Sequence, residues 1–430
     1  MTRKLAIALL LACVTFSAGA GVEIQVWHAM DGASRAELER LVARFNASEP
    51  AYRVVTAHKG SHDWTLASAL AARGKPSAPH IVHVDETGNV DLAAQKATLR
   101  PLWEVMSQAG VRLEGQYAAA LTGYYSDSRG RLLALPVATA TPVLYYNRDA
   151  FRRAQLDPAA PPKTWYGMAG TLGALIDSGA ACGLTTAWPS VLLENMSAWH
   201  NEPFAIRKDG GNGAAEDEAQ LSFNGKLMVR WIATLASWRK AGYFTYAGRE
   251  NEAEARFASG ECALLTSSSA SYPALRRRAE FDLGIAPLPY YEDFGGAPQN
   301  TLPGGAALWV MSDKPKADYR GVALFMAFLL GDHVQAQWHQ RTGFLPLTRA
   351  AYELSRKQGF YASHPGEEVG VRQLLLKSAT RDSQGVRLVR LGSVRRIINE
   401  ELELVWADKK TPLAALNAAV ARGNAMLDRR

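Results

Sequence analysis

Short apolar runs alternate with amphipathic stretches along the first part of the chain. The apolar runs are typical of buried strands, and they cover residues 21–27, 53–57 and 80–84. Between the first two runs, apolar residues recur at helical spacing, namely Leu38, Leu41, Val42 and Phe45. This spacing predicts a helix with one apolar face, and Ser34 and Glu37 form a capping box at its expected start. With a second helix predicted over residues 64–72, the order of elements indicates a largely parallel sheet.

The same alternation returns later in the chain. It predicts strands over residues 142–146, 262–266 and 281–287, and helices over residues 148–154 and 273–280. The end of the chain is expected to be mostly helical. Glycine and proline are spread throughout, and the Gly-rich acidic loop at residues 208–217 is too short to separate domains. The sequence therefore predicts two α/β lobes between which the chain passes more than once.

The N-terminus has the pattern of a targeting segment. Arg3 and Lys4 precede an apolar stretch, and Ala-Gly-Ala at residues 18–20 is a small-residue cleavage site. This predicts a signal peptide over residues 1–20 and export of the mature chain. Leu-Leu-Ala-Cys at residues 10–13 leaves a lipoprotein signal as an alternative, in which Cys13 would carry a lipid.

Composition and charge exclude several classes of protein. The formal net charge of +7 is small for 430 residues, and no Lys/Arg run has interleaved aromatics, so a nucleic-acid partner is not expected. Beyond the signal, the longest apolar run covers residues 323–330, far below the ~20 residues that span a bilayer. The mature chain has two cysteines, Cys182 and Cys262, which permit one disulfide or two free thiols.

Motifs for catalysis, cofactors and metals are largely missing. The sequence has no G-x-S-x-G, H-E-x-x-H or P-loop pattern, so neither an enzyme nor a bound cofactor is expected. The pairs His58/His62 and His80/His83 have spacings that zinc ligands use. Gly60 argues against a helix between the first pair, and scattered surface or pocket histidines are the favoured interpretation. No metal site is expected.

Three features suit an anion. Residues 266–269 read Thr-Ser-Ser-Ser between a strand and a helix, where hydroxyls and backbone N–H groups suit phosphate. Paired glycines within residues 303–305 let the backbone approach a ligand. Arginines form bidentate bonds to phosphate, and several lie close together at Arg387, Arg390, Arg395 and Arg396. N-capping serines, a tight turn and a solvated helix face are the ordinary structural alternatives.

Specific segments identify a resemblance to a known family. TPVLYYNRDAF at residues 141–151, LDP at 156–158 and PPKTW at 161–165 resemble the signature region of solute-binding proteins of ABC importers, in the carbohydrate-type cluster. Further segments narrow the resemblance to the glycerol-3-phosphate-binding branch, at residues 26–32, 123–128, 194–199, 304–311, 338–347, 400–406 and 409–412. The resemblance covers essentially the whole mature chain.

The resemblance implies a fold and a division of the chain. The fold would be α/β, with two lobes joined by crossing hinge segments and a ligand cleft between them. Residues 21–137 plus about 282–312 would form the N-terminal lobe, and residues 138–281 plus about 313–430 the C-terminal lobe. The lobes would close on the ligand, and the closed form would dock on the permease subunits of the inner membrane, which work with a cytoplasmic ATPase.

The ligand positions of the family can be carried over residue by residue. They fall on His62, Glu86, Ala140, Trp188, Ser268, Gly305, Phe344 and Arg395. His62, Ala140 and Phe344 depart from the family, which has tyrosine, serine and tyrosine at these positions. The other five keep the family's residue type, and the three departures each remove or change a hydroxyl.

The retained residues imply a chemistry for the ligand. Glu86 would accept from glycerol hydroxyls, and Trp188 would cover the carbon skeleton. Ser268, the Gly305 N–H and Arg395 would donate to a phosphate. Replacing Arg395 would then abolish binding and leave thermal stability nearly intact.

The expected function is that of a periplasmic solute-binding subunit of an ABC importer. Its ligand would be sn-glycerol 3-phosphate, a glycerophosphodiester such as glycerophosphocholine, or both. Another small polyol or sugar remains an alternative ligand. A periplasmic phosphodiester hydrolase and a chemoreceptor partner remain alternative functions.

Overall fold

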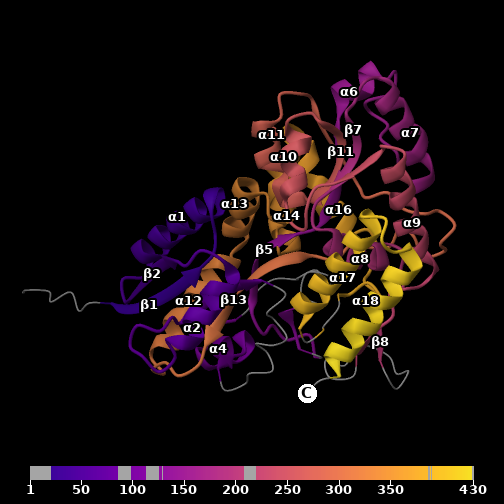
Figure 1. The fold of residues 1–430 in the computed structure, drawn as a ribbon. Helices are drawn as coiled ribbons and strands as arrows, with labels where there is room; N and C mark the ends of the chain where they lie inside the picture. The colour runs from indigo at the N-terminus through magenta and orange to yellow at the C-terminus, as the bar shows by residue number, and fades with distance from the viewer. Residues whose placement is uncertain are drawn as a thin grey trace, which may run out of the picture.

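The computed structural model describes residues 21–85, 98–112, 125–127, 129–207, 219–385, 388 and 390–428. The signal peptide expected over residues 1–20 therefore lies outside the described residues. The molecule has two lobes, each built around its own sheet with helices packed against it (Figure 1). This confirms the α/β, two-lobed fold expected from the sequence.

The sheet of the first lobe has the order β2-β1-β3-β13-β4, with β5 also paired to β13. Its strands are β1 (Val22–His28), β2 (Tyr52–His58), β3 (Ile81–Asp85), β4 (Leu99–Arg100), β5 (Leu135–Ala140) and β13 (Gly304–Met311). Strand β1 is parallel to β2 and β3, as the alternating pattern predicts, whereas β13 is antiparallel to β3, β4 and β5. The carboxyl ends of β1, β2 and β3 consequently lie at one edge of the sheet.

The helices of the first lobe come from two distant parts of the sequence. They are α1 (Gly32–Ser48), α2 (His62–Ala71), α4 (Leu102–Gln108), α12 (Asp318–Leu330) and α13 (Asp332–Thr342). Figure 1 shows α12 among the strands of this lobe, and its apolar residues share one core with β1. Helix α1 buries Leu38, Leu41, Val42 and Phe45, which confirms the predicted face.

The predicted start of α1 is wrong. The helix begins at Gly32, with Asp31 as its N-cap, so Ser34 lies inside the first turn. The Ser34 hydroxyl donates to the Asp31 carbonyl at 2.7 Å instead of capping a later N–H group. A serine in the first turn can bond back to the preceding backbone in this way, which is why the capping-box pattern misplaced the boundary.

The sheet of the second lobe has the order β10-β7-β11-β6-β12. Its strands are β6 (Pro142–Asn147), β7 (Cys182–Thr186), β10 (Phe244–Tyr246), β11 (Cys262–Ser268) and β12 (Leu283–Ala286). Strand β7 is parallel to β10 and β11, and their register places Cys262 opposite Cys182. The two residues form a disulfide with a Cα–Cα distance of 4.3 Å, which resolves the question that the sequence left open.

Helices cover the second sheet and the cleft side of this lobe. They are α6 (Arg148–Arg153), α7 (Trp165–Asp177), α8 (Pro189–Trp199), α9 (Lys226–Lys240), α10 (Glu252–Ala258), α11 (Tyr272–Arg278), α17 (Leu391–Trp406) and α18 (Pro412–Leu427). Helix α17 packs on α8, and α18 packs on α9 and α17. The 3-10 turn η2 (Ser269–Ser271) joins β11 to α11. The remaining elements are β8 (Ala205–Arg207), β9 (Ala219–Leu221), α14 (Arg349–Lys357), α15 (Phe360–Ser363), η3 (Pro365–Glu367) and α16 (Glu368–Leu374).

The structure moves the expected lobe boundaries. Residues 282–312 were expected in the N-terminal lobe, yet β12 pairs with β6 in the second sheet. Residues after 312 were expected in the C-terminal lobe, yet α12 and α13 pack against α1 and the first sheet. The segment that returns to the first lobe therefore runs from β13 to α13. The apolar face of α12 is the physical reason, because it completes the core beneath β1.

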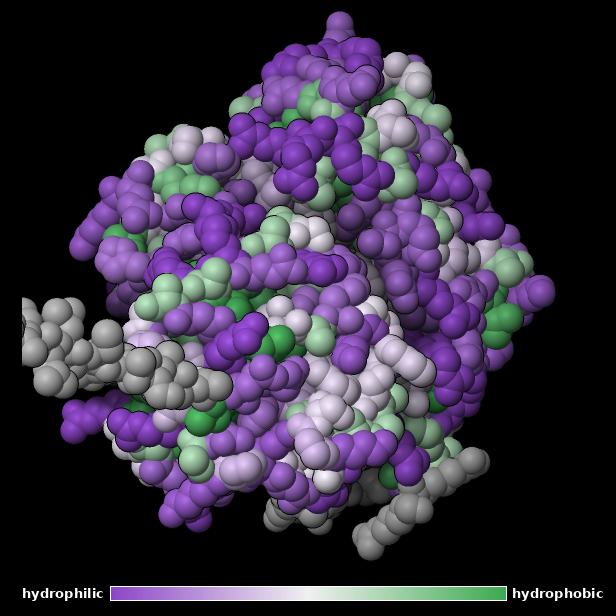
Figure 2. All heavy atoms as spheres, turned by 90° about the vertical axis from the view of Figure 1, so that its left-hand side faces the viewer, coloured by the Kyte–Doolittle hydropathy of each residue, from purple (hydrophilic) through white to green (hydrophobic). Residues whose placement is uncertain are grey.

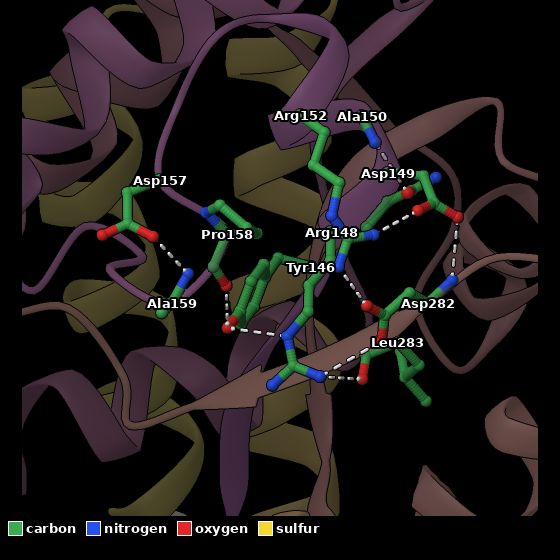
Figure 3. Close-up of polar contacts among 11 residues, drawn as sticks. Tyr146, Arg148, Asp149, Ala150, Arg152, Asp157, Pro158, Ala159, Asp282 and Leu283 are labelled. Atoms are coloured by element: carbon green, nitrogen blue, oxygen red, sulfur yellow. Dashed lines mark hydrogen bonds and ion pairs between the residues drawn. The ribbon is translucent and has the colours of Figure 1, made fainter.

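The signature segment forms a polar corner between β6, α6 and β12 (Figure 3). The guanidinium of Arg148 donates to the Asp282 carboxylate at 3.2 Å and to the Leu283 carbonyl at 3.3 Å. The Tyr146 hydroxyl donates to the Pro158 carbonyl at 3.0 Å. The bonds of Arg148 fasten the start of β12 to the end of β6, and the Tyr146 bond fastens the loop after α6 to β6. The segment that carries the family resemblance thus stabilises the second lobe, and the side chains of Tyr146, Arg148 and Asp282 do not line the cavity described below.

The outer face of the first lobe is mainly hydrophilic. Figure 2 shows hydrophobic residues on it as small separate spots among polar ones. Within the described residues, no helix combines the length and the hydrophobicity needed to cross a bilayer.

Candidate functional site

A cavity of about 670 Å³ lies between the two lobes. Its size is within the usual range for a small-molecule site. The first lobe contributes the ends of β3 and β5, the start of β13 and the start of α2, and the second lobe contributes β11, α8 and α17. The residues expected at the ligand that line this cavity are His62, Ala140, Trp188, Ser268, Gly305, Phe344 and Arg395. The eighth, Glu86, lies outside the described residues.

Gly305 brings the backbone of β13 to the cavity wall. Its φ of +123° is in a region that favours glycine, and a Cβ there would lie 1.7 Å from the Ala138 carbonyl oxygen. The hydroxyl of Tyr125 donates to the Gly305 carbonyl at 2.8 Å. Position 305 therefore accepts only glycine, and it lets a ligand approach the main chain closely.

The sequence predicted the serine run between a strand and a helix, but β11 continues to Ser268, and only Ser269 lies in the connection to α11, within η2. The Ser268 hydroxyl accepts from the Ala270 N–H at 3.2 Å and keeps its own hydrogen for donation. The neighbouring hydroxyls of Ser267 and Ser271 donate to the buried carboxylate of Glu254 at 2.7 and 2.5 Å. The run is consequently held in place on both sides of Ser268.

Trp188 is held in a strained backbone conformation at the start of α8. Its φ of 52° and ψ of 56° are left-handed, which costs about 1–2 kcal/mol for a residue with a Cβ. Its N–H donates to the Glu250 carbonyl at 2.9 Å, and Pro189 follows as the first helical residue. Trp188 remains 38% exposed and lines the cavity. Strain of this kind is typical of functional sites, because the surrounding structure must maintain it.

Arg395 lies on α17 and is paired with a residue that the sequence analysis missed. Its Nε and Nη2 donate to the two carboxylate oxygens of Glu194 on α8, at 2.7 and 2.9 Å. The side chains of Arg395 and Glu194 are 11% and 1% exposed. The bidentate pair fixes the direction of the guanidinium toward the cavity. The sequence did offer a signal, since Glu194 is the only charged residue within the helix PSVLLENMSAW.

The other arginines of the predicted cluster have separate roles. Arg396 also lines the cavity and donates to Glu400 at 3.0 Å on the exposed side of α17. Arg390 donates to the Met426 carbonyl at 3.0 Å, away from the cavity. Arg387 lies outside the described residues. Of the described arginines in this cluster, Arg395 is the most buried one at the cavity.

The wall formed by the first lobe contains histidines and carboxylates. The rings of His62 and His83 lie 4.8 Å apart, and His83 is almost fully buried at the cavity edge. Burial, followed by the nearby charges of His62 and His28, holds the pKa of His83 well below its usual range. Asp63 and Asp85 line the same side. Among the described residues, no group of three or more His, Cys, Asp or Glu could hold a metal ion.

Ala140 and Phe344 provide apolar surface to the cavity. Ala140 ends β5 opposite Gly304, and the ring of Phe344 stacks on that of Trp338 at 6.2 Å. The Phe344 carbonyl accepts from the imidazole of His339 at 2.7 Å, which fixes the backbone of this loop. Neither side chain offers a hydrogen bond to a ligand, in agreement with the two departures noted in the sequence.

Comparison with known sequences gives one family over most of the chain. The family model described as "Bacterial extracellular solute-binding protein" matches residues 40–366. The sn-glycerol-3-phosphate-binding periplasmic protein UgpB of Yersinia pestis bv. Antiqua (strain Antiqua) is 43% identical over 421 residues, which cover 97% of this chain and 95% of the relative. UgpB of Escherichia coli O1:K1 / APEC is 44% identical over 427 residues, which cover 99% and 96% of the two chains.

Solved structures share the two-lobed architecture. UgpB from Mycobacterium tuberculosis in complex with glycerophosphocholine superposes with a TM-score of 0.78 at 24% identity, covering 96% of this chain and 99% of that one. The cyclic α-maltosyl-1,6-maltose binding protein from Arthrobacter globiformis gives a TM-score of 0.75 at 21% identity, covering 95% and 100%. At these identities the likeness concerns the fold.

Proposed function

Because the chain belongs to the family of bacterial extracellular solute-binding proteins, we propose that it is the solute-capturing subunit of an ABC importer for glycerol phosphates. Its ligand is sn-glycerol 3-phosphate, a glycerophosphodiester such as glycerophosphocholine, or both. One observation carries the proposal. The cavity between the lobes is lined, from both lobes, by every described residue that the family resemblance implies at the ligand.

The residues divide into two groups by their chemistry. Ser268, the N–H of Gly305 and Arg395 donate to the phosphate, and a charged arginine at a preformed site suits an anion. Trp188 covers the glycerol skeleton with its indole face. Glu86 accepts from the glycerol hydroxyls, as the family resemblance implies. The arrangement supports binding of an anion, since the described residues of the cavity offer several donors to one.

The three departures favour a diester. Ala140 and Phe344 each lack a hydroxyl that the family places at the ligand, and His62 replaces another. A hydrogen bond to a charged group contributes about 1.5–3 kcal/mol, so a phosphate dianion loses more from these changes than a singly charged phosphodiester does. We infer that the protein prefers a glycerophosphodiester, or binds it as tightly as glycerol 3-phosphate.

The family also indicates where in the cell the protein acts and with which partners. The relatives are periplasmic proteins. We propose that this chain is exported by its N-terminal signal peptide, acts in the periplasm, and delivers its ligand to the permease subunits of the inner membrane. Closure of the lobes over the cavity then distinguishes the loaded from the empty protein.

Titration calorimetry of the purified mature protein tests the proposal. The panel consists of sn-glycerol 3-phosphate, glycerophosphocholine, glycerol and maltose. Binding of at least one phosphate compound, with no heat from glycerol or maltose, is the expected result. Binding of maltose alone would favour a sugar importer. Release of choline from glycerophosphocholine by the purified protein would show a hydrolase instead.

A further inference from the structure

We propose that His62 and His83 act as a proton-binding pair in the wall of the first lobe. When the anionic ligand is bound, His62 is protonated, and it donates one ring N–H to the phosphate and the other to His83. His83 acts through His62 and is a positioning residue. This inference rests on the proposed function, since it concerns how the same cavity receives its phosphate. The family has tyrosine at position 62, so the features that the chain shares with the family do not provide such a pair.

The first observation is a buried imidazole whose polar atoms are not used. His83 lies on β3, lines the cavity and is 2% exposed. Neither of its ring nitrogens has a hydrogen-bond partner among the described residues. Buried polar groups are nearly always hydrogen-bonded in native proteins, so a group of this kind at a ligand cavity indicates a partner that is recruited during function.

The second observation is the position of His62, which can become that partner. The centroids of the two imidazole rings lie 4.8 Å apart, and their planes are inclined by 52°. Two imidazoles that share an N–H···N bond of about 3 Å have centroids about 5 Å apart, so only the orientation of the rings has to change. The contact of the His62 imidazole with the His83 carbonyl is 3.5 Å long and does not oppose this rotation strongly.

The environment places the proton of the pair on His62. Burial, followed by the nearby charges of His62 and His28, holds the pKa of His83 well below its usual range, so its imidazole stays neutral and keeps a lone pair as an acceptor. A protonated His62 has two N–H donors, one for His83 and one for the ligand. An anion in the cavity favours this charged form, so binding is accompanied by the uptake of a proton.

The groups around the pair leave this role to the ligand. Of the strands beside β3, β1 contributes His28, whose pKa burial lowers to about 4, and β13 places Leu308 opposite His83. The described charged residues that line the cavity nearby are Asp31, Asp63 and Asp85 on the first lobe and, across it, Arg249, Arg395 and Arg396. Among the described histidines, those within 4.0 Å of a carboxylate are His58, beside Asp31, and His80, beside Asp318. The charge of a protonated His62 is therefore not already compensated by a described carboxylate.

The main experiment counts protons by titration calorimetry. Glycerophosphocholine is titrated into the protein in two buffers of different ionisation enthalpy, since the difference in heat gives the number of protons taken up. This ligand is chosen because a phosphodiester has no ionisation step near neutral pH, unlike a monoester. We expect the wild type to take up about half a proton or more per ligand near pH ~7.5, and its affinity to rise severalfold as the pH falls toward ~6.

Variants assign the proton to the pair. His62→Gln should abolish the uptake. His83→Leu removes the acceptor but keeps an apolar side chain of similar size, and it should reduce the uptake to less than about half and flatten the pH dependence. His83→Gln should restore both, because its side-chain carbonyl can accept from His62. A purely structural role for His83 would change the affinity without changing the proton count.

His58→Gln is the matched control. His58 ends β2 in the same lobe, and it does not line the cavity. Its replacement should leave the proton uptake unchanged.

Nitrogen-15 NMR of the imidazoles provides a second measurement that needs no variant, since it distinguishes charged from neutral rings. On addition of glycerophosphocholine, the charged fraction of His62 should rise while His83 stays neutral with one hydrogen-bonded nitrogen.

Three results would overturn the inference. They are binding of glycerophosphocholine by the wild type without proton uptake between about pH 6 and about pH 8, an unchanged uptake in a folded His83→Leu protein, and an uptake that persists in His62→Gln. The last of these would place the proton on another group, such as Asp63 or Asp85. If His83→Leu does not fold, the NMR measurement decides, and a neutral His62 in the complex contradicts the pair.

A failure of the proposed function looks different. If only sn-glycerol 3-phosphate binds, the same proton count is made at about pH 8, where the monoester is fully ionised. If neither compound binds the wild type at any pH, the proposed function itself fails.

Discussion

The two walls of the cavity differ in how firmly their side chains are held. On the second lobe, Ser268 is bonded through its hydroxyl and its carbonyl, Trp188 through its backbone N–H, and Arg395 through two bonds to Glu194. On the first lobe, the contact of the His62 imidazole with the His83 carbonyl is 3.5 Å long, a distance at the limit of hydrogen bonding.

This difference indicates that the two walls of the cavity have different roles in ligand binding. A wall whose donors are already fixed loses little conformational entropy when a ligand arrives, so it binds the phosphate with less cost. His62, on the wall of the first lobe, is held less firmly and can adjust as the lobes close. We therefore expect changes on the second lobe to affect affinity most, and changes on the first lobe to affect closure and selectivity.

Removing Arg395 should have the largest effect. Arg395→Ala should abolish detectable binding at micromolar ligand and should also destabilise the fold by about 3–5 kcal/mol, because the buried carboxylate of Glu194 loses its bidentate partner. The structure corrects the expectation from sequence that stability would stay nearly intact. Calorimetry and urea unfolding measure the two effects.

The double variant Arg395→Ala/Glu194→Gln should recover most of the stability and none of the binding. Tight binding by Arg395→Ala would show that the fixed wall is not the anion site.

Variants of Trp188 test whether its strained backbone conformation contributes to ligand binding. Trp188→Ala should weaken binding roughly ten- to a hundredfold, since an aromatic contact with its buried area contributes on the order of 1–3 kcal/mol. Trp188→Gly should bind as poorly but be more stable than Trp188→Ala by about 1 kcal/mol, because glycine adopts a φ of 52° without strain. Wild-type affinity in both variants would remove Trp188 from the site.

The departures at Ala140 and Phe344 offer a change that strengthens binding. The double variant Ala140→Ser/Phe344→Tyr restores two hydroxyls at the cavity. It should raise the affinity for sn-glycerol 3-phosphate by about tenfold or more, with a smaller gain for glycerophosphocholine. Calorimetry with both ligands measures this. If the wild type already binds the monoester far more tightly than the diester, and the double variant adds nothing, then our interpretation of the departures is wrong.

His28 in the first lobe should have the smallest effect at neutral pH, and its contribution should appear in acid. Burial, followed by the charges of His58 and Arg35, lowers the pKa of His28 to about 4. The unfolded chain binds a proton at His28 near pH 6.5 and the folded chain does not, so stability is fully present above that pH and declines as the pH falls toward 4. Thermal unfolding between pH 7 and 4 should show this decline.

A variant separates His28 from the other groups. His28→Asn keeps an acceptor for the Met30 N–H and should reduce the decline. Part of the decline should remain, because burial also lowers the pKa of His200 in the second lobe to about 4. A profile identical to that of the wild type would mean that His28 does not contribute to the loss of stability in acid.

The sequence predicted the elements of the fold better than their assembly. Apolar runs located β1, β2, β3, β6 and β11 to within about two residues, because a buried strand consists mainly of apolar residues. The return of α12 and α13 to the first lobe was not visible, since an apolar helix face does not specify which sheet it covers. The disulfide depended on the register of Cys182 and Cys262 in neighbouring strands, which spacing alone does not reveal.

The candidate site shows the same limit. Residues such as Gly305 and Ser268 could be selected because their local sequence suits an anion and resembles the family. Glu194 could not be paired with Arg395, because the two residues are 201 positions apart and meet only when α17 packs on α8. An ion pair between residues so far apart in the sequence can be identified only in the folded structure.

The central claim is that the fixed donors of the second lobe receive the ligand and the first lobe closes over it. Small-angle scattering of the mature protein, with and without glycerophosphocholine, tests it most directly. The account predicts a smaller radius of gyration in the presence of ligand, because the lobes approach each other around the cavity. An unchanged radius at a ligand concentration that calorimetry shows to be saturating would contradict it.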